Sequence, residues 1–388
     1  MLKATKDKLL PTAIIGSLPR PSWYTQNLHG RTFTEALGDS AYREQYLDAV
    51  QCQVGAQERA GLDIVTDGDS RFDLEVGGRS WFSYVSERIG GLGPVSKHSR
   101  WLDFQEVRPG HILRELDEVY RPPRVVGPVT PGPLEYTEVW KIAQRMTSRP
   151  VKFGAIASGS LIHLLWNEYY ATDHDLVMDL TKIMNREYRQ LAGAGAALIQ
   201  VEEPPIHFAA CTGTDTPPER LREMVEEFNA EVNGVQTEIW AHTCWGNANQ
   251  QAGFWHVPTY EKALPYLSEL DADVVTFECA TTDGRDFPLL GKWETDKKIG
   301  IGVINHTITT VEPADVVADR IRRALEHIPV ERLVVVTDCG FGREGLSRRI
   351  AFYKCVALVQ GTNIVRHELG LPLAEVPAEN EGLALVER

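Results

Sequence analysis

Residues 239–244, with the sequence IWAHTC, place an imidazole and a thiol where one metal ion could use both. The apolar start of this stretch indicates a β-strand running into a loop. Side chains on a strand repeat every second position, so His242 and Cys244 leave it on the same face. Zinc binds imidazole nitrogen and thiolate sulfur. The alternative is a buried Cys244 that acts as a small hydrophobe, so the metal interpretation depends on ligands from other elements.

Eight apolar runs, mostly separated by helical patterns, are the elements that must bring such ligands together. Continuous apolar runs are typical of parallel strands buried on both faces. Strands are predicted over 12–17, 62–66, 152–157, 197–201, 237–242, 272–277, 298–304 and 333–337, and helices over 41–60, 138–147, 173–194, 217–233, 259–269, 313–328 and 345–360.

This alternation predicts an α/β protein, a (β/α)8 TIM barrel forming a single domain over residues 1–388. An irregular insertion rich in Trp, Tyr, Pro and Arg is expected after the second strand, at about 80–150. The alternative is an open doubly wound sheet. No G-x-G-x-x-G follows any predicted strand, so dinucleotide binding has no support.

Reactive side chains collect at the predicted carboxyl ends of the strands, where barrels build their active sites. They are Ser17, Asp69, Glu202, His242, Cys244, Glu278, His306 and Cys339. His242, Cys244, Glu278 and Cys339 would make a tetrahedral metal set. Taken singly, Glu278 could be a solvated carboxylate, Cys339 a buried cysteine and His306 a satisfied core histidine.

Other residues of the same types carry less weight. Asp69 and Arg71 could form a surface ion pair. Cys52, Cys211, Cys279 and Cys355 are predicted not to be ligands, and His163, His207 and His256 are weaker candidates for the same pocket.

Composition limits the class of partner. The 388 residues are 43% hydrophobic and 24% charged, with a net charge of -14, which argues against binding nucleic acid or an anionic membrane. No run approaches the ~18 apolar residues of a membrane helix, and no export signal is evident. A cytoplasmic protein with reduced thiols is therefore expected. The oligomeric state is not indicated.

Several segments together resemble the catalytic half of cobalamin-independent methionine synthase and its shorter relatives, over nearly the whole chain. The segments are IIGSLPRP, DIVTDGDSR, PPRVVGPV, AQRMTSRPVKF, IQVEEPP, AHTCWGN, FECA, GVINHT and VTDCGFGR. The resemblance implies a zinc cofactor bound by His242, Cys244, Glu278 and Cys339, with His306 as the proton donor. It also implies substrate binding by Ser17, Asp69, Arg71 and Glu202, and places Trp166 near the pterin of a folate donor.

The chain departs from the family pattern at the predicted substrate pocket. The family usually has Glu at the position of Asp69 and Asp at that of Glu202, and its Thr-Gly-Pro-Val-Thr segment is replaced by residues 158–162, SGSLI. Residues 95–120 look like an insertion relative to the family. The N-terminal half of the full-length enzymes has no counterpart here.

The resemblance implies a zinc-dependent methyltransferase that activates homocysteine or a similar thiol and takes the methyl group from a methyl-folate-type donor. Zinc would lower the thiol pKa, and His306 would protonate the leaving group. The alternatives are an epoxide-opening transferase of the epoxyalkane:coenzyme M type and a non-catalytic zinc-binding scaffold. Two carboxylates favour an amino-acid thiol over a sulfonate unless Arg20 or Arg71 faces inward.

Overall fold

Seven parallel strands form one curled sheet at the centre of the molecule, in the order β1-β10-β9-β8-β7-β6-β4. The computed structural model describes residues 1–73, 80–97, 121–202, 204–212, 215–246, 258–342 and 346–379. The strands are β1 (Thr12–Ala13), β4 (Phe153–Ile156), β6 (Leu198–Glu202), β7 (Glu238–Thr243), β8 (Val274–Phe277), β9 (Lys298–Ile304) and β10 (Leu333–Thr337). Because β6 to β10 are buried along their whole length, polar residues at their carboxyl ends are also removed from solvent.

The predicted second strand, 62–66, closes this sheet. It forms a single parallel bridge, from Val65 to Val151. On one side the Ile64 N–H donates to the carbonyl of Thr12 in β1, at 3.1 Å; on the other the Lys152 N–H donates to the carbonyl of Val65, at 2.8 Å. The predicted (β/α)8 barrel is therefore confirmed, with the eighth strand reduced to a bridge between the two edges of the sheet.

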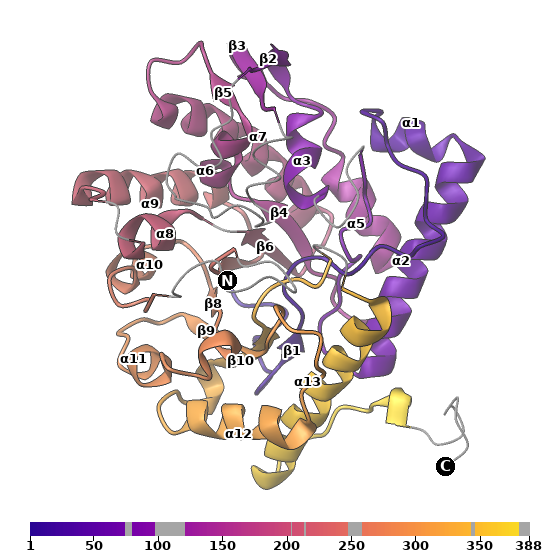
Figure 1. Ribbon diagram of the computed structural model, residues 1–388, viewed down its shortest axis with the longest axis vertical. Helices are drawn as coiled ribbons and strands as arrows, with labels where there is room; N and C mark the ends of the chain where they lie inside the picture. Colours follow the sequence, from indigo (N-terminus) through magenta and orange to yellow (C-terminus); the bar gives the residue numbers. More distant parts are fainter. Residues whose placement is uncertain are drawn as a thin grey trace.

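Helices surround the sheet, as Figure 1 shows. They are α1 (Phe33–Leu37), α2 (Ser40–Ala60), α6 (Ser158–Leu161), α7 (Asp173–Gly193), α8 (Ile206–Cys211), α9 (Pro218–Val232), α10 (Leu264–Ser268), α11 (Phe287–Gly291), α12 (Ala314–Leu325) and α13 (Arg348–Glu368). Local signals set several bounds: the Asp39 carboxylate accepts from Ala41 N–H at the start of α2, and Gly61, with φ 89°, ends that helix. The helix predicted over 259–269 is shortened to α10.

The region 80–150, predicted to be irregular apart from a helix over 138–147, contains more regular structure in its described part. It holds α3 (Ser80–Ser86), β2 (Gly90–Val95), β3 (Pro123–Thr130) and α5 (Tyr136–Gln144), which confirms that helix. The strands β2 and β3 join β5 (Trp166–Asn167) in a separate three-stranded sheet, at the top of Figure 1. Residues 98–120, which make up most of the segment 95–120 that looks like an insertion, lie outside the described residues.

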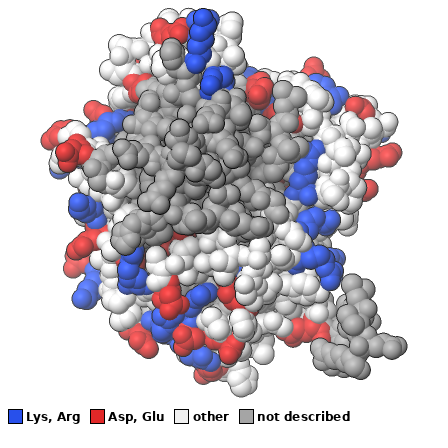
Figure 2. All heavy atoms as spheres, viewed as in Figure 1, with Lys and Arg blue, Asp and Glu red and all other residues white. Residues whose placement is uncertain are grey.

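The described surface carries charges of both signs. Figure 2 shows Lys and Arg interspersed with Asp and Glu around the rim of the face in view. None of the helices in the described ranges is both long and apolar enough to span a lipid bilayer.

Candidate active site

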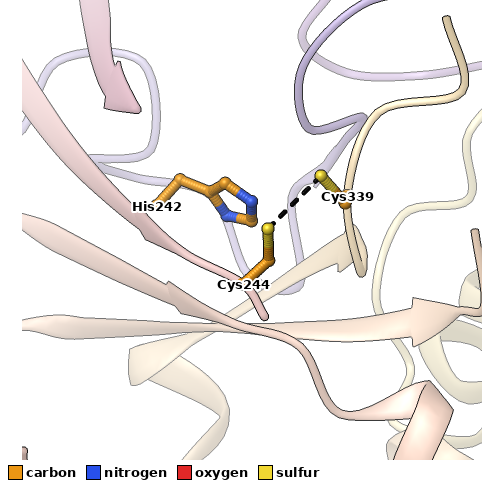
Figure 3. Close-up of side chains that lie close together, drawn as sticks. All are labelled: His242, Cys244 and Cys339. Carbon is orange, nitrogen blue, oxygen red and sulfur yellow. Dashed lines mark hydrogen bonds between the residues drawn. The ribbon is translucent and has the colours of Figure 1, made fainter. Parts of the chain in front are cut away.

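Three of the predicted ligands meet at the carboxyl ends of β7 and β10. His242 lies near the end of β7, Cys244 follows that strand, and Cys339 lies two residues beyond β10. One ligand atom from each lies within 4.8 Å of the others, and all three residues are buried. Figure 3 shows the imidazole of His242 and the thiol of Cys244, both from the end of β7, pointing toward the thiol of Cys339.

The spacing of the two thiols fits a shared metal ion. The Sγ atoms of Cys244 and Cys339 are 3.5 Å apart, whereas a disulfide needs about 2.05 Å. Two sulfurs on one tetrahedral zinc, each about 2.3 Å from it, would be about 3.8 Å apart. His242 Nδ1 is 2.8 Å from the hydroxyl oxygen of Thr276, which orients the ring so that Nε2 would be the coordinating nitrogen.

Glu278, the fourth predicted ligand, lies in a second group, with His306 and Asp338, whose candidate ligand atoms are also within 4.8 Å of one another. Its Oε2 accepts from the backbone N–H of Trp245 at 2.9 Å, next to Cys244. Its Oε1 accepts from the Thr281 hydroxyl at 2.7 Å. Glu278 is therefore tied to the Cys244 segment, and its place in the ligand set stays a prediction.

Asp338 was not anticipated from the sequence, although it directly precedes Cys339. It is fully buried, and its carboxylate accepts three backbone N–H groups, from Cys279, Ala280 and Thr281, each at 2.8 Å. Burial, reinforced by the charge of Glu278, raises its pKa well above the usual value. Asp338 thereby fixes the segment that carries Glu278 to the strand that carries Cys339.

His306 follows β9 and is only 2% exposed. The preceding residue is held firmly: the Asn305 N–H donates to Glu312 Oε1 at 2.7 Å, and Lys354 Nζ donates to the Asn305 carbonyl at 2.9 Å. One of its ring nitrogens lies within 4.8 Å of a carboxylate oxygen of Glu278, and its role as proton donor stays a prediction.

Two of the predicted substrate residues, Asp69 and Glu202, lie beside Gly154, on β4. A Cβ built on Gly154 would lie 2.9 Å from Glu202 Oε1 and 3.9 Å from Asp69 Oδ1. A Cβ built on Gly16 would lie 3.8 Å from Glu202 Oε2. The neighbouring Ser17 is buried, and its carbonyl accepts from Phe341 and Gly342, beyond Cys339. The structure thus brings the segments of Ser17, Asp69 and Glu202 together beside the three predicted metal ligands.

The pair formed by Asp69 and Arg71 is buried, so the surface interpretation is wrong. Arg71 Nη1 lies 3.3 Å from Asp69 Oδ1 and 3.5 Å from Asp67 Oδ2, and its Nη2 donates to the Gly154 carbonyl at 2.8 Å. Burial raises the pKa of Asp69 to about 6 against the opposing charge of Arg71, and lowers the pKa of Lys152 to about 7. The cluster of Asp67, Asp69, Glu202, Arg71 and Lys152 holds three carboxylates and two cations, all buried.

Arg20 and Trp166 lie in other surroundings. Arg20 Nε donates to the Tyr24 carbonyl at 2.6 Å, and its guanidinium carbon is 4.3 Å from the centre of the Phe72 ring. Trp166 is half-buried on β5, paired with Arg124 of the three-stranded sheet. Its predicted place near a donor stays a prediction.

The weaker histidine candidates are placed differently from one another. His207 is buried on α8, and its Nε2 is 2.5 Å from the Cys244 carbonyl, so it supports the ligand segment through the backbone. His163 lies in a short 3-10 turn after α6. His256 lies outside the described residues. Cys52, Cys211, Cys279 and Cys355 are not in the group formed by the two ligand thiols.

Comparisons with known proteins find relatives along nearly the whole chain. The family model described as the catalytic domain of cobalamin-independent synthase matches residues 10–357. The chain is 33% identical over 373 residues to a methionine synthase of Saccharolobus solfataricus, covering 94% of this chain and 97% of the relative. It is 31% identical over 366 residues to a methionine synthase of Sulfolobus acidocaldarius, covering 93% and 94%. A structure of a B12-independent methionine synthase from Shewanella sp. W3-18-1, in complex with selenomethionine, is similar with a TM-score of 0.72 and 25% identity, covering 93% of this chain and 99% of that one.

Proposed function

This chain belongs to the cobalamin-independent synthase family, and from that premise we propose that it is a zinc-dependent methyltransferase. Its acceptor is the thiol of homocysteine or a similar amino thiol, and its donor is of the methyl-folate type. The observation that carries the proposal is the buried convergence of one imidazole and two thiols at the carboxyl rim of the barrel.

Zinc would be held by His242, Cys244 and Cys339, with Glu278 as the fourth ligand. These donors suit zinc, which accepts nitrogen, sulfur and carboxylate oxygen. Bound zinc would lower the pKa of an incoming thiol, so that it is a thiolate near neutral pH. Glu278 is the hardest base of the set and would be the weakest of the four ligands for zinc.

His306 is the general acid of this proposal. It lies beside Glu278 and Asp338, where it can give its proton to the departing nitrogen of the donor. General acid catalysis of this kind is typically worth about 10²–10⁴-fold. A non-catalytic scaffold would not need a buried histidine beside the metal group.

The buried charges favour an acceptor that carries an ammonium group. Three carboxylates face two cations in the cluster around Gly154, so an ammonium would complete the balance. The Arg71 charge is offset by Asp69 and Asp67, and Arg20 is bound to backbone carbonyls. A sulfonate thiol such as coenzyme M would therefore meet net negative charge. The selenomethionine bound by the Shewanella relative is an amino acid of the same class as methylated homocysteine.

The test is a thiol competition assay on the zinc-loaded protein, with homocysteine and coenzyme M, a methyl-folate donor and, in parallel, a short epoxide. We expect methylation of homocysteine with the folate donor. Preferential alkylation of coenzyme M by the epoxide would instead establish the epoxide-opening activity and overturn the proposal.

A further inference from the structure

Lys152 and Gln200 form a buried series of hydrogen bonds that leads to Glu202, one of the proposed substrate residues. Lys152 Nζ donates to the Gln200 side-chain carbonyl and to the Ile14 carbonyl, the latter at 2.5 Å. Gln200 Nε2 donates to Glu202 Oε1 at 2.8 Å. All three side chains lie at no more than 3% exposure.

The chemistry of the three groups fixes which group donates and which accepts in each of these hydrogen bonds. An ammonium group only donates and a carboxylate only accepts, so the amide of Gln200 has one compatible orientation. Gln200 and Glu202 are two residues apart on β6, hence on one face. Lys152 enters from the residue before β4, the strand that pairs with β6. Lys152, next to β4, thus contacts Gln200 on β6, and Gln200 contacts Glu202 on the same strand.

We infer that Lys152 and Gln200 are positioning residues that keep Glu202 oriented and ionised, so that the pocket selects thiols bearing an ammonium group. The inference rests on the proposed function for the identity of the pocket. It adds two residues whose contacts make an ammonium group, rather than a neutral group, the preferred ligand.

Glu202 needs these two residues because its carboxylate is buried. An isolated carboxylate in a protein interior takes up a proton rather than remain charged, and a protonated Glu202 would lose its attraction for an ammonium. Lys152 supplies the compensating charge in its ammonium form, which the neighbouring carboxylates of Glu202 and Asp69 favour against burial. Its Nζ lies 4.9 Å from the centre of the Trp240 ring, which covers its other side. Gln200 hydrogen-bonds to both Lys152 and Glu202, so it links the two charged groups and separates Lys152 from the proposed ligand.

The test compares the binding of homocysteine with that of 4-mercaptobutyrate, which has the same carbon chain and carboxylate but no ammonium. Dissociation constants are measured by calorimetry on the zinc-loaded wild type, Lys152→Met and Gln200→Leu. We expect the wild type to prefer homocysteine and each variant to bind homocysteine about 10- to 100-fold more weakly, the loss of a hydrogen bond to a charged group. Binding of 4-mercaptobutyrate should change by less than about threefold, a smaller change than the loss of one neutral hydrogen bond.

Two further variants separate positioning from folding. Gln200→Glu keeps an acceptor for Lys152 but turns a carboxylate toward Glu202, and it should lose the same preference. Lys298→Met removes another buried lysine, at the start of β9, whose Nζ donates to the Thr5 carbonyl at 2.6 Å. It should leave the ratio of the two dissociation constants unchanged.

An unchanged ratio in Lys152→Met and Gln200→Leu, or an equal weakening of both thiols, would overturn the inference. Absence of preference in the wild type would overturn it as well. Because the measurement is of binding, it does not depend on turnover. A protein that shows the predicted ratios but methylates neither thiol would refute the proposed reaction. It would still establish the role of Lys152 and Gln200 in selecting the ligand.

Discussion

At the scale of single residues, the proposed function depends on two buried carboxylates, Asp69 and Glu202, that stay charged. Asp69 has a left-handed backbone, with φ 52°, and its short side chain is held by Arg71. Glu202 is one methylene longer and reaches over Gly154. The two carboxylates therefore approach the same space from different elements, with lengths reversed relative to the family pattern.

The pKa of Asp69, raised to about 6 by burial, predicts a pH dependence of substrate choice. Below that pH the carboxylate gains a proton and loses its charge, so it attracts an ammonium less; above it the charge is complete. The ratio of kcat/KM for homocysteine to that for 4-mercaptobutyrate should fall as the pH drops through about 6. Taking this ratio cancels effects of pH on the metal site. A ratio that is flat from pH 5 to 8 would remove Asp69 from ammonium recognition.

His306→Gln should retain its fold and metal while turnover drops by about 10²–10⁴-fold, because glutamine keeps the polar volume but cannot deliver a proton. Zinc analysis and circular dichroism serve as the controls, and single-turnover methyl transfer is the measurement. If turnover survived intact, the proton would have to come from water or another group.

Residue types and spacing were sufficient to predict that His242 and Cys244 share a face, and the structure brings Cys339 to them. Asp338, Lys152 and Gln200 could not be predicted in the same way. Their roles depend on side chains contributed by neighbouring strands, and the sequence spacing within one strand does not determine those contacts.

At the scale of elements, strand register decides which side chains meet. Gly154 on β4 pairs with Gln200 on β6, and Glu202 pairs with His242 on β7. Glu202 and the predicted ligand His242 therefore lie on adjacent strands at one rim of the barrel. The eight strand segments were predictable because buried parallel strands are continuously apolar. The sheet of β2, β3 and β5 was not: glycine and proline interrupt its strands, and the register of β2 against β3 shifts between Gly90 and Leu92.

Gly154→Ala should weaken binding of homocysteine, because the added methyl group would lie 2.9 Å from Glu202 Oε1 and displace the carboxylate. A displacement of that order costs about 10- to 100-fold in kcat/KM. Gly193→Ala is the matched control: it ends α7 with no atom within 4 Å of the added carbon. Equal activity of the two variants would show that Gly154 is not at the pocket.

At the scale of the whole molecule, the barrel is closed by contacts between segments far apart in the sequence. Asp63 Oδ2 accepts from the Thr12 N–H at 2.9 Å, at the edge strand β1, and from Arg366 of α13 at 2.6 Å. In Figure 1, α13 lies beside α2, so the last long helix packs on the first. Asp63 therefore connects the segment that closes the barrel to both ends of the chain.

Asp63→Ala should lower the free energy of unfolding by about 2–4 kcal/mol, because it leaves Arg366, which is 5% exposed, without its carboxylate. Chemical denaturation is the measurement. The control is Glu368→Ala, which breaks an exposed pair with Arg322 and should cause no resolvable change. Equal stability of the two variants would contradict the role given to Asp63.

The most direct test of the account is the zinc content of the purified protein and of two cysteine variants. Cys339→Ser removes a predicted ligand, whereas Cys279→Ser changes a buried thiol in the neighbouring loop that is not in the ligand group. We predict about one zinc per chain, the content of a single four-ligand site, in the wild type and in Cys279→Ser, and a sharp fall in Cys339→Ser. Undiminished zinc in Cys339→Ser would contradict the account.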